Sequence, residues 1–389
     1  MVFYDYNSDI RYIFDLIKLS VKLAIIPPLE EAREKNNNFK YYSLTFIAIT
    51  VLGNAFRLYG LVVYFIPISK GTSIVLGVVL IIGSTLMSIV TILVAMFNRD
   101  TWITFINMFK YIDHKLNKGQ VMVEGRNLLK VEIMTWHVII LCIFGYDAYV
   151  WYSSYGWTLF RFSLFRYINY YHCVMSILVV HHFAKALRAR FKRINGLLVK
   201  SNDLRKIIKR LIPKTDSSHF NNLKCINDVT DYYLFLSELV DMFNKLFGWQ
   251  IFFMTEILIV MLLELMNSFM LAIDFTQVTT DAHHDLRTIF FLVALSVVLI
   301  LFHAQVVLYC EDVNEESRRT LAVCYNLQQA VDPHSHERKE LIILSDVVNL
   351  LNTGTNAAGF YFINRSLISR IFAYLFSYSI VLIQFNKQT

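Results

Sequence analysis

The stretch that decides the fold is residues 71–97, GTSIVLGVVLIIGSTLMSIVTILVAMF, which contains no charged side chain. A helix of about 20 apolar residues is long enough to cross the hydrocarbon core of a bilayer. The rest of the 389-residue chain has the same character, since 56% of its residues are hydrophobic and only 17% are charged. A soluble protein rarely has this balance. The sequence therefore predicts a polytopic membrane protein.

Seven apolar segments of suitable length occur along the chain. They cover residues 42–67, 71–97, 133–153, 164–184, 248–273, 288–310 and 366–385. We predict an all-α membrane protein with seven transmembrane helices, some of which continue past the membrane into a cytoplasmic anchor bundle. Its expected parts are a cytoplasmic N-terminal segment, a six-helix ligand-binding bundle with cytoplasmic extensions at 185–247, cytoplasmic anchor helices, and a pore helix with the extracellular C-terminus. In order, these parts cover residues 1–41, 42–310, 311–365 and 366–389.

Lysine and arginine are concentrated on one side of the predicted membrane. The connections at 1–41, 98–132, 185–247 and 311–365 hold 30 of them, whereas the opposite side holds four. Omitting the long connection 185–247 still leaves 17 against four. Because cytoplasmic loops carry the excess of these residues, we expect a plasma-membrane protein with its N-terminus in the cytoplasm and its C-terminus outside. Seven-helix receptors that signal through G proteins have the reverse orientation.

Several charged residues fall inside or next to the predicted spans. Arg57 lies in the first span, Glu256 and Glu264 lie in the fifth, and Arg365 and Arg370 lie at the start of the seventh. A charge in a membrane usually faces a partner, the interior of a bundle or water. If the fifth and seventh spans touch, the last two arginines are the expected ion-pair partners of the two glutamates. A functional path through the bundle is the alternative role.

The connection between the third and fourth spans is rich in aromatic residues, with thirteen between Phe144 and Tyr171. Tyrosine and tryptophan gather at membrane interfaces for ordinary amphipathic reasons. The alternative is a ligand pocket that opens outward, in which aromatic rings stack and a carboxylate accepts hydrogen bonds. The candidate ligand-binding residues are Tyr146, Asp147, Tyr149, Trp151, Tyr167 and Tyr170.

Sequence motifs for catalysis or cofactor binding do not occur. The pairs His181-His182 and His283-His284 are adjacent in sequence, so their side chains point about 100° apart on a helix, and no acidic residue follows at helical spacing to complete a metal site. Phosphate loops and nucleophile elbows are also missing. We expect no enzyme activity, cofactor or metal, and no nucleic-acid partner, because the net charge of +7 is explained by the cytoplasmic face.

The last apolar segment carries a polar amide near its end. Ser377, Val381 and Gln384 are separated by four and three residues, which places them on one face of a helix. Several copies of this face around an axis would form an apolar constriction beside a ring of amides. The simpler alternative is an amide at the membrane interface.

Three segments resemble the insect gustatory receptor family, whose members are seven-transmembrane chemoreceptor channels related to insect odorant receptors. Ser377-Tyr378, a hydrophobic run and Gln384-Phe385 are similar to the family's C-terminal Thr-Tyr and Gln-Phe signature, with Ser377 in place of threonine. The segments GFYFINRSL at 359–367 and FNKLFGWQ at 243–250 look like two further patterns of the family.

The resemblance implies a tastant-gated, non-selective cation channel. Such channels assemble as a homotetramer, or as a heterotetramer with related receptors, within membrane lipid. The last helix of each subunit would line the pore, with Ser377, Val381, Gln384 and Phe385 at its outer end. A bitter or otherwise aversive organic tastant suits an aromatic pocket with one carboxylate, although sugars also stack on aromatic rings. A secondary transporter is a further alternative, but we find no internal repeat in the sequence.

Overall fold

The computed structural model describes residues 16, 18–29, 33–65, 71–116, 126–211, 217–275, 282–351 and 353–388. Helices make up 91% of it. Just before the last helix, a small antiparallel hairpin pairs β1 (Asn356–Ala357) with β2 (Tyr361–Phe362). The helices are α2 (Arg33–Gly60) with its π-helical continuation η1 (Leu61–Phe65), α3 (Gly71–Phe97), α4 (Arg99–Leu116), α5 (Arg126–Leu211), α6 (Ser217–Phe275), α7 (Ala282–Ala330), α8 (His336–Leu350) and α9 (Arg365–Gln388).

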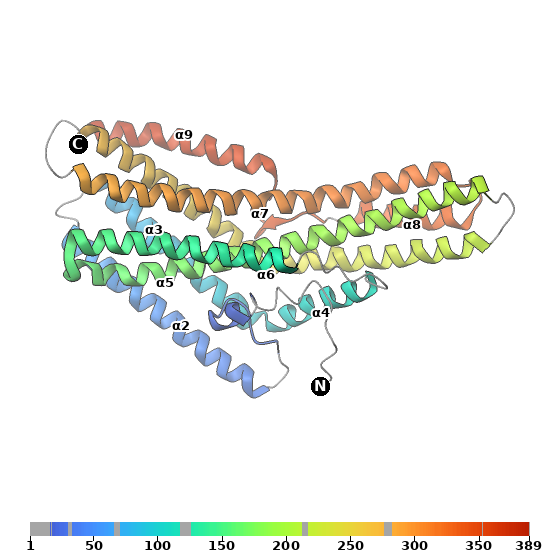
Figure 1. Ribbon diagram of the computed structural model, residues 1–389, viewed down its shortest axis with the longest axis horizontal. Coiled ribbons are helices and arrows are strands. Elements are labelled where there is room, and N and C mark those ends of the chain that lie inside the picture. Colours follow the sequence, from blue (N-terminus) through green and yellow to red (C-terminus); the bar gives the residue numbers. More distant parts are fainter. Residues whose placement is uncertain are drawn as a thin grey trace.

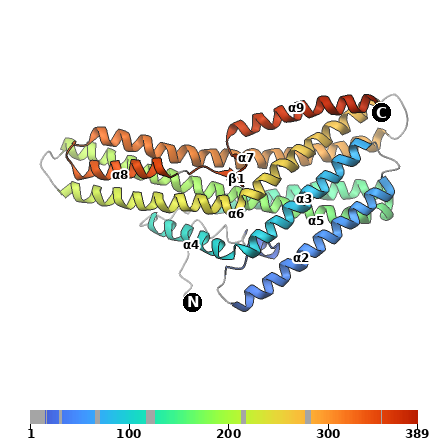
Figure 2. The same ribbon diagram turned by 180° about the vertical axis from the view of Figure 1, so that it is seen from behind.

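Helix α5 consists of two antiparallel arms. At Gly156 the backbone has φ 65° and ψ −177°, a conformation that glycine adopts without the steric cost of a Cβ atom. The chain reverses there, at the end of the molecule where α9 also ends (Figures 1 and 2). The predicted third and fourth spans are therefore the two arms of one helical hairpin.

The helices form an elongated bundle with two parts (Figure 1). In one part α2, α3, both arms of α5, α6 and α7 pack together, and α9 lies against α6 and α7. In the other part α5, α6 and α7 continue beyond the end of α3, and α8 packs against α6 and α7. The predicted extensions at 185–247 are helical where the structure describes them, and the predicted anchor segment 311–365 contains the end of α7, α8 and the β-hairpin. Residues 1–15 of the predicted N-terminal segment lie outside the described residues.

Five helices in the described part of the chain have the length and hydropathy of membrane spans. They are Asn37–Tyr64, Thr72–Phe97, Val131–Ser154, Ile226–Met270 and Ile289–Ala330. The two other predicted spans, at 164–184 and 366–385, are also helical, as the second arm of α5 and as α9. An all-α fold with several membrane-spanning helices is thus confirmed, and the count of seven spans stays a prediction.

Helix α4 lies within the predicted connection 98–132, between the second and third predicted spans. Its buried side chains Trp102, Phe105, Phe109 and Ile112 recur at intervals of three and four residues, which is the pattern of a helix with one apolar face. Trp102 packs edge-to-face on Phe247 of α6, with ring centroids 5.2 Å apart. This aromatic cluster forms the core at the junction between the two parts of the bundle.

Candidate functional site

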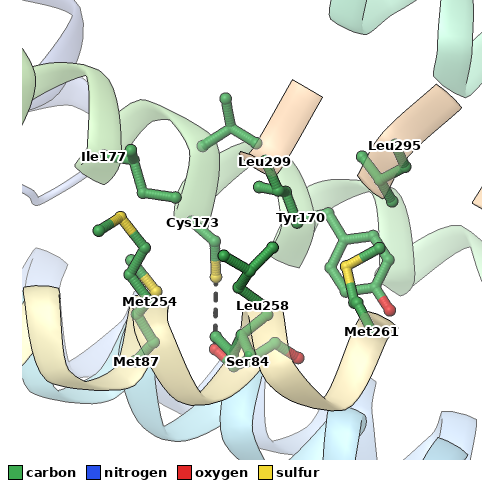
Figure 3. A pocket seen from close by; sticks show the side chains of 12 residues that line it. Ser84, Met87, Tyr170, Cys173, Ile177, Met254, Leu258, Met261, Leu295 and Leu299 are labelled. Carbon is green, nitrogen blue, oxygen red and sulfur yellow. Dashed lines mark hydrogen bonds between the residues drawn. The ribbon is translucent and has the colours of Figure 1, made fainter. Parts of the chain in front are cut away.

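An inner cavity of about 20 Å³ lies where α3, the second arm of α5, α6 and α7 meet. Figure 3 shows the side chains that converge on it. Apart from Ser84, Tyr170 and the thiol of Cys173, the lining consists of aliphatic and methionine side chains. A cavity of this volume accommodates about one water molecule. A larger ligand therefore requires the lining to move, and the flexible side chains of Met254 and Met261 are suited to such movement.

A hydrogen-bonded group of polar side chains lies beside the inner cavity, and two of its members, Ser84 and Cys173, line it. The amide of Asn169 donates to Ser84 Oγ at 2.8 Å, and Ser88 Oγ donates to Asn169 Oδ1 at 2.7 Å. The thiol of Cys173 donates to the carbonyl of Ser84 at 3.5 Å, a contact drawn in Figure 3. These groups bond to one another, so they fix α3 against α5 and leave little hydrogen-bonding capacity for a polar ligand.

A larger outer cavity, of about 170 Å³, lies closer to the Gly156 end of the molecule. Its lining comes from the end of α2 and η1, the start of α3, both arms of α5, and α6. Unlike the inner cavity it contains charged side chains, namely Arg57, Arg166 and Glu264, beside the rings of Trp151 and Phe162.

A buried ion pair joins the two arms of α5 beside the outer cavity. Arg166 donates to Asp147 Oδ2, and the hydroxyl of Tyr167 donates to the same oxygen at 2.5 Å. The guanidinium carbon of Arg166 lies 5.1 Å from the ring centre of Trp151 and 5.4 Å from that of Phe291. Aromatic faces attract a cation at this range. The carboxylate, the phenol and the rings together stabilise one positive charge inside the bundle.

Two further charged side chains line the outer cavity and form no ion pair among the described residues. Arg57 Nη1 and Glu264 Oε2 are buried and form no hydrogen bond there. The guanidinium of Arg57 lies over the ring of Tyr170, 5.5 Å from its centre. Because Tyr170 also lines the inner cavity, this ring lies between the two cavities.

The predicted ligand-binding residues have different locations. Tyr170 lines the inner cavity, Trp151 lines the outer cavity, and Asp147 and Tyr167 belong to the ion-pair group. Tyr146 and Tyr149 are exposed, with exposed fractions of 36% and 65%, and line neither cavity. These two positions suit the membrane-interface interpretation of the aromatic stretch.

Sequence reasoning did not single out the apolar lining of the inner cavity. Its principal members on α6 are Met254, Leu258 and Met261, which follow ordinary helical spacing and carry no chemical signal of their own. Arg57 was identified as a charge that needs a partner or water, and the structure places it at the outer cavity.

Helix α9 contacts its own chain along one narrow stripe. Leu367, Ile371, Leu375 and Ser379 recur every four residues and are buried, and Ser379 Oγ donates to the sulfur of Met266 on α6 at 3.2 Å. The rest of the helix is largely exposed and apolar, with Phe372, Tyr374, Phe376, Tyr378, Ile380 and Val381 each more than 40% exposed. A membrane helix of this kind has a broad surface available for lipid or for other subunits.

The predicted pore residues lie on or beside this exposed surface. Ser377, Val381 and Gln384 are all exposed in the single chain, and the hydroxyl of Ser377 is bonded to the carbonyl of Ala373 at 3.0 Å. The side chain of Phe385 lies outside the described residues.

The arginines at the start of α9 have other partners than the sequence predicted. Arg365 pairs with Asp312 and Glu315 on α7, each at 3.5 Å. Arg370 donates to Asn364 and Ser366 at 3.3 Å. Glu256 is exposed on α6, and Glu264 lies at the outer cavity. The expected pairing between the fifth and seventh spans is replaced by these contacts because the start of α9 lies beside α7.

The segments 243–250 and 359–367 meet through the β-hairpin. Asn244 of α6 donates to the carbonyl of Gly354 at 2.9 Å and accepts from the backbone N–H of Asn356 at 3.0 Å. A Cβ atom at Gly248 would lie 2.6 Å from the backbone nitrogen of Ala358, so only glycine allows α6 and the hairpin to approach this closely. The hairpin leads directly into α9, which links the position of α9 to that of α6.

Comparisons with known proteins agree on one architecture. A sequence model of the 7tm chemosensory receptor family matches residues 16–389. The structure of the insect olfactory receptor OR5 from Machilis hrabei in complex with eugenol has a TM-score of 0.56 at 11% identity, covering 96% of this chain and 99% of that one. A second structure of the insect olfactory receptor OR5 from Machilis hrabei has a TM-score of 0.53 with the same identity and coverage. No curated protein sequence matches.

Proposed function

This chain belongs to the insect 7tm chemosensory receptor family, and on that premise we propose that it is a gustatory receptor that acts as a ligand-gated, non-selective cation channel. The family match over residues 16–389 is the observation that carries the receptor function. The similarity of residues 377–385 to the gustatory C-terminal signature favours a taste receptor over an olfactory one.

The proposed pore is formed by α9 from four subunits. Support comes from the single buried stripe of α9, which leaves Val381 and Gln384 free to face a central axis. A ring of Val381 side chains would exclude water from a closed gate, and a ring of Gln384 amides would replace part of an ion's hydration shell. Ser377 and Phe385 would lie beside this constriction. The subunits are either identical or related receptors.

The proposed agonist is a small, largely apolar organic tastant that enters the inner cavity. A sugar would bring several hydroxyl groups into a lining that offers few free partners, and an unsatisfied hydroxyl is costly to bury. Tyr170 provides an aromatic ring in the lining, and the thiol of Cys173 is already bonded to the carbonyl of Ser84. The related OR5 receptor has been solved with eugenol, a small phenol. Bitter or aversive aromatic compounds are therefore the first ligands to test.

Enlarging a side chain of the inner cavity is expected to weaken the response to such an agonist. Val174 lines the cavity and is 2% exposed. In Val174→Leu one added methylene occupies ligand space, and we expect the agonist concentration for half-maximal current to rise roughly tenfold or more. The measurement is agonist-evoked current in excised patches from cells that express only this receptor, without added nucleotides.

Val179→Leu is the matched control for that experiment. Val179 lies on the same arm of α5 and is fully buried, but it does not line the cavity. The agonist concentration for half-maximal current of Val179→Leu is expected to remain close to that of the wild-type receptor. Equal shifts in the two variants would show that the agonist does not bind in the inner cavity. A response that requires intracellular GTP would contradict direct gating.

The proposed orientation places the α8 part of the bundle in the cytoplasm and the Gly156 turn outside. The excess of lysine and arginine in the connections around the α8 part supports this arrangement. An epitope tag at the C-terminus is expected to bind antibody on intact cells, whereas a tag at the N-terminus binds only after permeabilisation. The opposite labelling pattern is that of a receptor coupled to G proteins and would overturn the proposed topology.

A further inference from the structure

The outer cavity holds two opposite charges for which the described residues provide no hydrogen bond or ion pair. Arg57 and Glu264 both line it, and Arg57 Nη1 and Glu264 Oε2 form no hydrogen bond within the described residues although both atoms are buried. Arg166, the third charged residue of the lining, is already paired with Asp147. The cavity therefore presents one guanidinium and one carboxylate that are available for a ligand.

Charges inside a membrane protein are costly unless something compensates for them. A cationic ligand would neutralise Glu264 and leave Arg57 unpaired, and an anionic ligand would do the reverse. A ligand with an anionic group and a cationic group satisfies both side chains at once. Charge-assisted hydrogen bonds to both ends would also fix the orientation of such a ligand.

The remaining lining limits the size and character of the ligand. The side chains of Leu61, Ile74, Leu159, Trp151 and Phe162 surround the charged pair, so the cavity can take an apolar group as well. Its volume of about 170 Å³ exceeds that of the inner cavity, which is about 20 Å³. Phe162 is held in place by the ring of Phe56, whose centre is 4.5 Å away.

We propose that the outer cavity binds a small zwitterion, an α-amino acid with an apolar side chain, whose carboxylate contacts Arg57 and whose ammonium group contacts Glu264. The inference rests on the proposed receptor function only in treating the chain as a sensor of small organic molecules. The Arg57 guanidinium also contacts the ring of Tyr170, which lines the inner cavity. An amino acid bound to Arg57 in the outer cavity would thus be linked, through the ring of Tyr170, to the proposed agonist in the inner cavity.

The test is binding of radiolabelled L-phenylalanine to the purified full-length receptor in lipid nanodiscs. Two analogues each lack one charged group: phenethylamine has no carboxylate, and 3-phenylpropanoate has no ammonium group. We expect phenylalanine to bind and each analogue to compete roughly tenfold or more weakly, since each loses one charge-assisted hydrogen bond. Undetectable binding of phenylalanine at millimolar concentration, or equal competition by either analogue, would overturn the proposal.

Variants test which side chain contacts the carboxylate of the ligand and which contacts its ammonium group. R57Q is expected to weaken phenylalanine binding to the level of phenethylamine, and E264Q to the level of 3-phenylpropanoate. The matched controls are K40Q and E256Q, because Lys40 lies on α2 with Arg57, Glu256 lies on α6 with Glu264, and neither lines the outer cavity; both are expected to bind as the wild type does. Unchanged binding in R57Q and E264Q would contradict the assignment. If either variant fails to fold, the analogue series on the wild-type receptor decides.

Binding does not require the channel to open, so its outcome is independent of the pore. A receptor that opens with an inner-cavity agonist but does not bind phenylalanine would refute this inference and leave the proposed function intact. A receptor that binds phenylalanine more tightly than both analogues but carries no current would support this inference and refute the proposed channel function.

Discussion

Asp147→Ala is expected to destabilise the receptor by about 3–5 kcal/mol, because it leaves the buried charge of Arg166 without its carboxylate. Asp147 accepts from Arg166 and from the hydroxyl of Tyr167, and all three side chains lie between the arms of α5. The variant is expected to reach the cell surface in much smaller amounts. Its detergent-solubilised form should lose its monodisperse elution peak at a lower temperature than the wild type does.

The double variant Asp147→Ala with Arg166→Met separates the loss of the ion pair from the burial of an unpaired charge. Removing both partners leaves no uncompensated charge, so the double variant is expected to be more stable than Asp147→Ala alone. Asp147→Asn retains an acceptor for Tyr167 and is expected to fall between the wild type and Asp147→Ala. A double variant that is less stable than the single variant would show that Arg166 has sufficient partners without Asp147.

Gly248→Ala is expected to cost about 1–3 kcal/mol of stability, the range for overpacking a tightly packed site. The new Cβ would lie 2.6 Å from the nitrogen of Ala358, 3.0 Å from its Cα and 3.5 Å from the carbonyl oxygen of Asn356. All of these are backbone atoms, so the hairpin has to move away from α6. The hairpin leads into α9, and we therefore also expect a changed agonist concentration dependence.

Gly145→Ala is the matched control, because Gly145 lies in α5 and no described atom is within 4 Å of its would-be Cβ. Alanine favours a helix over glycine by about 1 kcal/mol, so Gly145→Ala is expected to be neutral or slightly stabilising. Heat stability and concentration–response curves are measured for both variants. Equal behaviour would mean that the contact between Gly248 and the hairpin has no role in stability or gating.

Much of the fold could be predicted from hydrophobic runs and charge distribution. The uncharged run at 71–97 is α3 with the same bounds, and the long periodic pattern after the fourth predicted span continues as α5 to Leu211. The extent of α4 was missed because its buried apolar residues are interspersed with polar ones, such as Thr104, Asn107 and Lys110, within a segment of low mean hydropathy. The β-hairpin was missed because its strands have only two residues each, and pairing that short depends on contacts with α6.

Less of the candidate site than of the fold could be predicted from the sequence. Asp147 and Tyr167 were predicted as ligand-binding residues, and the structure places them in an ion-pair group with Arg166 that the sequence did not predict. The inner cavity could not be predicted, because Met254, Leu258 and Met261 resemble any other buried helix face. The partners of Arg365 were also not predictable, because Asp312 and Glu315 lie 50 or more residues away in sequence and only the path of α7 brings them close.

Chemical modification of Gln384→Cys during current recording tests most directly whether α9 lines the path of the ions. The background carries Cys142→Ser, since Cys142 is an exposed free cysteine. The matched control is Ser379→Cys, on the buried stripe of α9. We predict that a positively charged methanethiosulfonate reagent applied from outside reduces the agonist-evoked cation current of Gln384→Cys and leaves that of Ser379→Cys unchanged. Unaltered current in Gln384→Cys after the reagent is shown to have reacted would contradict the account.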